Sequence, residues 1–193
     1  AGYNSTTQTL AKNEYAIVNT HIPEKINITI NKVWNDSDNQ DGLRPETTTI
    51  DLLANGEIVD SVVLSDSNDW TYTFVDLDKN YDGSLINYTV NEVGMPDGYT
   101  VSYDGYTITN THVPEVIELH VVKEWIANFN QDGLRPDSVE VQLNVGDEVI
   151  ETLSLSEGNN WTYIFRELPR FADGSEIEYT VTETPVPGYT TTV

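Results

Sequence analysis

The chain has 193 residues, which suits about two domains of ordinary size, and 38% of them are hydrophobic, as in a globular protein. Its formal net charge is −23, and this weighs against nucleic acid and anionic membranes as partners. The sequence has no cysteine and no apolar run long enough to span a bilayer, so neither disulfide staples nor membrane insertion are expected. The acidic residues are dispersed, which is typical of a soluble, self-repelling surface.

The chain repeats itself at a fixed interval, which indicates tandem modules. Lys32 and Lys123 stand 91 residues apart, and each is followed two positions later by a tryptophan. The same offset links Asn19 to Asn110. Three longer motifs repeat in the same way: Asp41–Pro45 with Asp132–Pro136, Trp70–Phe74 with Trp161–Phe165, and Tyr88–Glu92 with Tyr179–Glu183.

The offset predicts the domain organisation. Residues 1–23 match the closing strand segment of a preceding module, 24–114 form module one, and 115–193 form module two without its last strand. Neighbouring repeats are therefore expected as partners within a longer parent protein.

Each module is expected to consist of short strands. Alternating stretches are separated by turn signals such as Asn55-Gly56 and Asp82-Gly83, and no window has a sustained 3.6-residue apolar period. The prominence of Tyr, Trp and Val also favours sheet over helix. We therefore predict an all-β fold of tandem antiparallel β-sandwiches, Ig-like or prealbumin-like, with about seven strands each.

Three polar residues fall on the apolar faces of predicted strands. Lys32 shares a face with Ile28 and Ile30, and parity turns Glu92 and Asn110 inward as well. The matching residues of module two are Lys123 and Glu183. A buried ion pair beside a hydrogen-bonded asparagine, or strand ends that reach solvent, would also explain this pattern.

The motifs Lys-x-Trp, Asp-Gly-x-Arg-Pro, Trp-x-Tyr-x-Phe, Tyr-Thr-Val-x-Glu, Gly-Tyr and Asn-Thr-His follow one another in the chain. In this order they closely resemble the Cna protein B-type domain, over essentially the whole sequence. The resemblance implies a prealbumin-like sandwich with an isopeptide bond between a lysine of the first strand and an asparagine of the last, catalysed by a Glu or Asp between them. These residues would be Lys32, Asn110 and Glu92 in module one. Module two keeps Lys123 and the catalytic Glu183 but lacks the asparagine.

The implied chemistry is physically reasonable. Burial disfavours the charged forms of lysine and glutamate, so a neutral Lys32 amine can attack the Asn110 carboxamide. Glu92 can donate to the carbonyl oxygen and relay a proton to the departing ammonia. Each bond forms once, so no enzymatic turnover and no cofactor are expected.

The resemblance implies a structural stalk or spacer of a Gram-positive cell-surface adhesin or pilin-like protein, extracellular and attached to the cell wall in its full-length parent. A matrix- or carbohydrate-binding adhesin module is the alternative, and a hydrolase, suggested only by the plentiful carboxylates, is a third reading. Trp70 and Trp161 could stack on sugars. They share strand parity with Phe74 and Phe165, however, which favours a place in the core.

Metal binding is not expected. The run of Asp36, Asp38, Asn39 and Asp41 is similar to a calcium loop. Module two, however, has alanine and phenylalanine at the first two of these positions, which favours a polar turn. The three histidines show no zinc-binding pattern.

The two ends of the repeat pattern are mismatched. A module without its last strand exposes an apolar slot and a sheet edge, and both invite strand addition. We expect Tyr15–Asn19 of one chain to complete module two of another copy, where Asn19 could meet Lys123 and Glu183 and form an amide between chains. A segment boundary displaced by one strand is the competing explanation.

Overall fold

The structure is a computed structural model that describes residues 2–193. Strands dominate it, and the helices among these residues are three single 3-10 turns at Asp66–Asn68, Asn128–Asn130 and Glu157–Asn159. None of them has the length and apolarity needed to cross a membrane. The chain divides into two compact units. The first unit contains the described residues up to Asn35 and Pro45–Thr111, and the second contains Asp36–Arg44 and His112–Val193.

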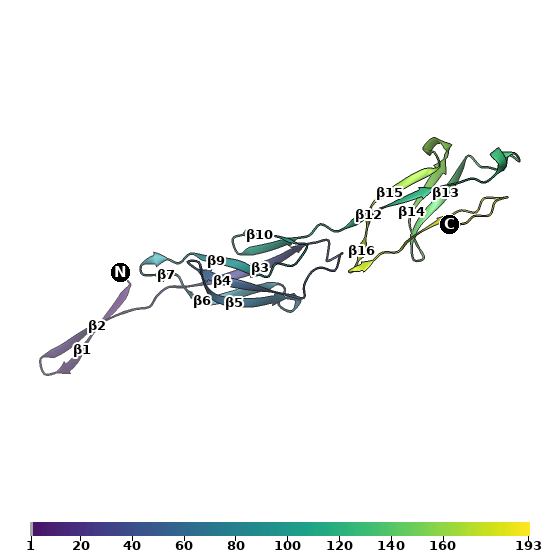
Figure 1. Cartoon of the computed structure of the whole chain (residues 1–193). Coiled ribbons are helices and arrows are strands. Elements are labelled where there is room, and N and C mark those ends of the chain that lie inside the picture. The colour runs from purple at the N-terminus through teal and green to yellow at the C-terminus, as the bar shows by residue number, and fades with distance from the viewer. Residues whose placement is uncertain (1) are drawn as a thin grey trace. The chain divides into compact units, whose positions relative to one another are not determined.

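Seven strands of the first unit form two sheets that face each other (Figure 1). One sheet has the order β10-β11-β3-β6, and the other has the order β5-β4-β9. The strands are β3 (Lys25–Asn35), β4 (Thr47–Ala54), β5 (Glu57–Ser65), β6 (Thr71–Asp78), β9 (Tyr88–Val93), β10 (Thr100–Asp104) and β11 (Thr107–Thr111). A short hairpin, β7 (Asn80–Tyr81) and β8 (Ser84–Leu85), accompanies them. The predicted all-β sandwich is confirmed.

The core of the first unit lies between the two sheets because every second side chain of each strand points inward. In β3, Ile28 and Ile30 are buried whereas Thr29 between them is exposed. They pack against Ile50 and Leu64 of the facing sheet and Ile108 of their own sheet. Complete burial of such a side chain contributes about 1.5–3 kcal/mol to stability, so this layer provides most of the hydrophobic stabilisation of the unit.

One strand pairing differs from a purely antiparallel sandwich. The last strand, β11, lies beside the first strand, β3, and runs parallel to it. In this register Lys32 is opposite Ile108, and Asn110 is opposite Trp34. Because Asn110 is two residues beyond Ile108, it lies on the same inner face as Lys32.

The second unit repeats the arrangement with fewer strands. Among residues 2–193, one sheet contains only β12 (Val116–Val122) and β15 (Thr162–Pro169), and the other has the order β14-β13-β18. The strands of this second sheet are β13 (Ser138–Val145), β14 (Glu148–Ser156) and β18 (Tyr179–Glu183), and a short hairpin joins β16 (Phe171–Ala172) to β17 (Ser175–Glu176). β12 corresponds to β3 but has a neighbour on one side only among the described residues. It ends at Val122, whereas β3 continues to Asn35 where β11 pairs with it.

The N-terminal segment is an antiparallel hairpin of β1 (Tyr3–Ala11) and β2 (Glu14–His21), in which Ser5 is opposite Asn19. Within residues 2–193 these two strands pair only with each other. Tyr15 and Ile17, which parity places on an inward face, are 65% and 72% exposed. The hairpin therefore carries apolar side chains that are largely exposed.

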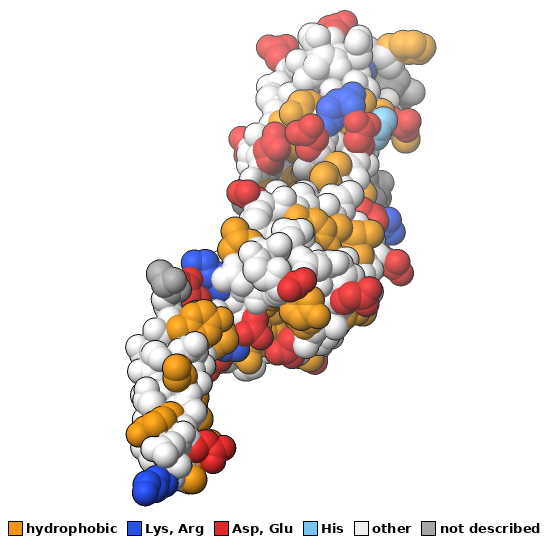
Figure 2. Space-filling model, turned by 90° about the vertical axis from the view of Figure 1, so that its left-hand side faces the viewer, with side chains coloured by type: hydrophobic (Ala, Val, Ile, Leu, Met, Phe, Trp, Pro, Cys, Tyr) orange, Lys and Arg blue, Asp and Glu red, His pale blue; other side chains and the backbone are white. Residues whose placement is uncertain are grey.

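The surface agrees with the charge of the sequence. Figure 2 shows acidic side chains spread over the visible face, with few lysines and arginines between them and no single acidic patch. Such a surface repels copies of itself at low ionic strength.

Candidate functional site

Lys32, Glu92 and Asn110 meet inside the first unit. They come from β3, β9 and β11, so both sheets contribute to the site. The Nζ atom of Lys32 lies 3.3 Å from Oε1 of Glu92 and donates a hydrogen bond to Oε2 at 3.4 Å. Asn110 donates from Nδ2 to Oε1 of Glu92 at 3.1 Å. All three residues that the sequence singled out in module one are thus brought together.

The site is dry. The side chains of Lys32 and Glu92 are 0% and 1% exposed, and Asn110 is fully buried. Burial lowers the pKa of the Lys32 ammonium below its ordinary value, and the nearby Glu92 only partly opposes this shift. The lysine nitrogen also lies 4.4 Å from the ring centroid of Trp34. That contact favours the charged form, as Glu92 does, but burial outweighs both and makes the neutral, nucleophilic amine easier to reach than in water.

Asn110 has an unusual imbalance in its hydrogen bonds. Its Nδ2 atom is held by Glu92, but its buried Oδ1 atom has no partner among the described residues. An unsatisfied buried acceptor costs about 1–3 kcal/mol, so such a group in a native structure requires an explanation. One explanation is that this carbonyl oxygen accepts a hydrogen bond only during a reaction.

Two further residues fix Glu92 and were not predicted from the sequence. The hydroxyl of Thr48 donates to Oε1 at 2.8 Å, and the backbone N–H of Glu92 donates to the hydroxyl of Tyr103 at 3.2 Å. Repetition could not reveal Thr48, because Val139 stands at the matching position of the second unit. The available signal was that Thr48 shares strand parity with the apolar Ile50, which places its side chain on the inner face.

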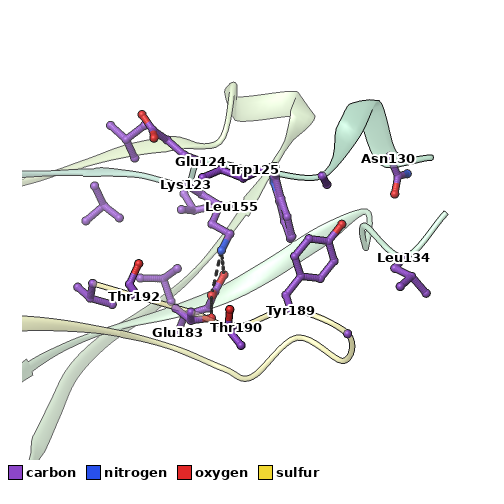
Figure 3. Close-up of a pocket in the computed structure, with 18 of the residues that line it drawn as sticks. Lys123, Glu124, Trp125, Asn130, Leu134, Leu155, Glu183, Tyr189, Thr190 and Thr192 are labelled. Carbon is purple, nitrogen blue, oxygen red and sulfur yellow. Dashed lines mark hydrogen bonds and ion pairs between the residues drawn. The ribbon is translucent and has the colours of Figure 1, made fainter. Parts of the chain in front are cut away.

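The second unit holds an incomplete version of this site, which Figure 3 shows. Lys123 Nζ lies 2.8 Å from Oε1 of Glu183 and donates to Oε2 at 3.0 Å. Thr191 donates its hydroxyl to the same Oε2 at 2.7 Å, and no asparagine of the described second unit does so. The Lys123 side chain is 16% exposed, against 0% for Lys32. Asn19 lies on β2 and is exposed.

A cavity of about 1100 Å³ opens beside this lysine. One wall is the chain that continues from β12 through Trp125, and another is the segment Tyr189–Val193 (Figure 3). Its apolar lining includes Val121, Val141, Leu155 and Val181. In the first unit the residues that match this lining pack around Ile108 of β11.

The other features singled out in the sequence lie elsewhere. Trp70 and Trp161 pack against the cores of their units, each edge-on to a second tryptophan at 5.2 Å, as the core interpretation predicted. Asp36 accepts two hydrogen bonds from the Arg44 guanidinium, at 3.0 and 2.7 Å, and one from the backbone N–H of Asn39. Across the described residues no three potential metal ligands gather in one place.

Comparisons with known proteins agree with the geometry. The Cna protein B-type domain family matches residues 28–111 and 119–193. A collagen adhesin of Staphylococcus aureus is 37% identical over 187 residues, which is 94% of this chain but 16% of that protein. The crystal structure of two B repeat units of the collagen-binding protein Cna of Staphylococcus aureus is similar as well, with 39% identity, a TM-score of 0.55, and coverage of 98% of this chain and 51% of that one. A single B repeat unit of the same protein is 42% identical with a TM-score of 0.45, over 86% of this chain and 90% of that one.

These matches cover both units, and they agree with the β-sandwich and the repeated motifs. The chain belongs to the Cna protein B-type domain family.

Proposed function

We propose that this chain is a stalk or spacer segment of a bacterial surface protein, and that a Lys32–Asn110 amide locks its first unit covalently. The observation that carries the proposal is that a buried lysine amine and an asparagine carboxamide both contact the same glutamate carboxyl group in a dry core, at 3.4 and 3.1 Å. An unreacted buried ion pair would have the same arrangement, and the experiment below distinguishes the amide from the ion pair.

The reaction balances without any co-reactant. Nζ of Lys32 attacks Cγ of Asn110, the new Nζ–Cγ bond forms, and the Cγ–Nδ2 bond breaks. Glu92 takes a proton from the attacking amine and delivers it to Nδ2, which leaves as ammonia. The Glu92 oxygen that receives the Asn110 N–H is already 3.1 Å from the leaving nitrogen. Because folding holds the groups together, no bimolecular encounter is needed.

The position of the bond suits a load-bearing element. β3 and β11 are the first and last strands of the sandwich and lie side by side. An amide between them would carry tension from one end of the unit to the other, so that the residues between Lys32 and Asn110 would stay folded. In the chain-entropy model a cross-link that closes so long a loop raises the free energy of unfolding by about 4–5 kcal/mol.

The relatives support a place at the cell surface. The matching curated protein is described as a collagen adhesin, and the solved neighbours are B repeat units of a collagen-binding protein. The chain spans about one sixth of that adhesin, so we infer a repeat segment of a longer extracellular protein, attached to the wall of a Gram-positive cell. The role is mechanical and involves no turnover.

Intact-mass measurement of the purified chain tests the amide. We expect a mass below that of the sequence by one ammonia for the first unit, and a branched peptide that joins Lys32 to Asn110 after digestion. A Lys32→Met chain should keep its full mass. A parent chain at the full sequence mass, with the two residues in separate peptides, would leave an ordinary buried ion pair.

A further inference from the structure

The second unit contains a segment that lies far from the rest of it in the sequence. The loop that follows β3, Asp36–Arg44, belongs to this unit together with His112–Val193. Each part carries a repeated motif that the proposed amide does not use: Asp-Gly-x-Arg-Pro, which begins at Asp41, and Asn-Thr-His, which ends at His112. The aspartate of the first motif contacts the histidine of the second.

One oxygen of the Asp41 carboxylate holds both ends of the linker between β11 and β12. Its Oδ2 atom accepts a hydrogen bond from Nε2 of His112 at 2.8 Å and another from the backbone N–H of Glu115, also at 2.8 Å. Because an ionised carboxylate can only accept, the histidine carries a hydrogen on Nε2. The side chains of Asp41 and His112 are 3% and 10% exposed, so water competes little for this contact. The linker is thus pinned at its first and last residues.

The backbone of the loop also packs closely against the turn between β16 and β17. The N–H of Gly174 donates to the carbonyl oxygen of Gln40 at 3.1 Å. A Cβ atom on Gly42 would lie 2.5 Å from Cα of Gly174, closer than real Cβ atoms come to another heavy atom. The φ angle of Gly42 is +71°, a second reason for glycine at this position. The loop is therefore seated directly on the β16–β17 turn.

Hydrogen bonds inside the loop hold it in an otherwise unfavourable shape. Residues 37–39 have φ angles of +52°, +58° and +60°, and non-glycine residues rarely adopt such values in succession. Asp36 accepts from the backbone N–H of Asn39 and from the Arg44 guanidinium. Oδ1 of Asn39 accepts in turn from the backbone N–H of Arg44. Because these bonds lie within the loop, they favour the shape that presents Asp41 to the linker.

We propose that the Asp36–Arg44 loop is a clasp, which keeps the linker His112–Glu115 folded in the second unit and prevents it from extending when the stalk is loaded. This role rests on the proposed stalk function, but the contacts themselves do not depend on the Lys32–Asn110 amide. A free linker of four residues can extend to roughly 14 Å. The pinned linker has to lose both hydrogen bonds to the carboxylate before it can do so.

The repeat pattern agrees with a built contact. Both motifs recur at the 91-residue offset, and Asp132 and His21 stand at the positions that match Asp41 and His112. The amide chemistry explains the repetition of lysine and glutamate but not of this aspartate or this histidine. A contact between the two gives a physical reason for both motifs to recur together.

Hydrogen exchange of single backbone amides in the full chain, followed by NMR, tests the clasp. The amides of Glu115 and Gly174 donate to atoms of the loop, so both should exchange slowly in the parent. Two variants that each remove one partner, Asp41→Ala and His112→Phe, should speed exchange at both amides by roughly tenfold or more. His120→Phe, which changes an exposed histidine of the same unit, is the matched control and should leave both amides protected.

A glycine variant tests the backbone packing separately. Gly42→Ala introduces a Cβ atom that would collide with Gly174, so it should release the same two amides. Gly146→Ala is its control within the second unit. Gly146 also has a positive φ, +57°, but a Cβ atom there would meet nothing within 4 Å. The control therefore carries the backbone strain without the collision, and it should keep the clasp closed.

The outcomes separate the clasp from the proposed function. Fast exchange at Glu115 and Gly174 in the parent would overturn the clasp, and so would slow exchange that persists in Asp41→Ala. Faster exchange confined to these two amides, with those of β13 still protected, supports it. Simultaneous loss of protection in β13 would mean that the loop is required for the fold of the unit, and would overturn a local clasp. Intact mass, measured in parallel, reports the first-unit amide: a full sequence mass with a protected linker overturns the amide and leaves the clasp standing.

Discussion

Asn110 donates its side-chain N–H to Oε1 of Glu92 at 3.1 Å, and the same oxygen accepts the hydroxyl of Thr48 at 2.8 Å. The two donors fix one edge of the carboxyl group against the nitrogen that would leave as ammonia. The position of that oxygen should therefore affect how fast the amide forms.

The first prediction concerns the proton relay. Glu92→Gln should give a folded chain whose first unit stays largely unlinked, because a glutamine can donate hydrogen bonds but cannot carry a proton from amine to leaving group. Intact mass and the Lys32–Asn110 peptide measure this. Glu46→Gln, at an exposed site, is the control and should cross-link like the parent. Equal cross-linking rates in the Glu92→Gln chain and the parent would rule Glu92 out as the relay.

The second prediction concerns Thr48. Thr48→Val keeps the side-chain shape but removes the donor to Oε1, so Glu92 should lose its fixed edge and the amide should form more slowly after refolding. In an unlinked Asn110→Ala background, the lost buried hydrogen bond should lower the free energy of unfolding by about 1 kcal/mol, as a denaturant titration would show. An unchanged rate with Thr48→Val would make that hydroxyl purely structural.

The sequence predicted which side chains face inward, because this follows from the two-residue period of a strand. It did not predict the features that depend on which strands are neighbours. Alternation placed Lys32, Glu92 and Asn110 on inward faces, and the structure finds all three buried. Parity cannot say which strands adjoin, so the parallel pairing of β11 with β3 was not predicted. Thr48 was missed for a related reason. Its role depends on a contact with β9, and at that position the two repeats differ.

The third prediction concerns the alternative reading as a sugar-binding module. Trp70 packs against the core and its indole N–H donates to Asp66 at 2.7 Å, so its polar edge is already occupied. Titration with glycans should therefore leave the tryptophan fluorescence of the chain unchanged. A saturable change that disappears in a Trp70→Phe or Trp161→Phe chain would establish a binding site and revive that reading.

The last prediction is a pH dependence of the unlinked first unit. An Asn110→Ala chain cannot form the amide, so it retains a buried Lys32 whose pKa burial holds below the ordinary value of 10.5. Between the folded pKa and 10.5 the unfolded chain binds more protons than the folded one, and the free energy of unfolding should therefore rise with pH in this window. The rise is about 1.4 kcal/mol for each unit between the two pKa values.

The control is a Lys32→Met/Asn110→Ala chain, which lacks this titration. Burial raises the pKa of the Tyr88 hydroxyl, and that of Tyr179, so their ionisation lowers stability at high pH, but in both chains equally. The difference between the two chains, from guanidinium titrations followed by circular dichroism, isolates Lys32. Below the folded pKa of Lys32 the difference should be constant, with the full cost of the buried charge present. A difference that does not change between neutral pH and pH 10.5 would mean that Lys32 stays protonated in the folded unit, and the neutral-amine mechanism would then lose its basis.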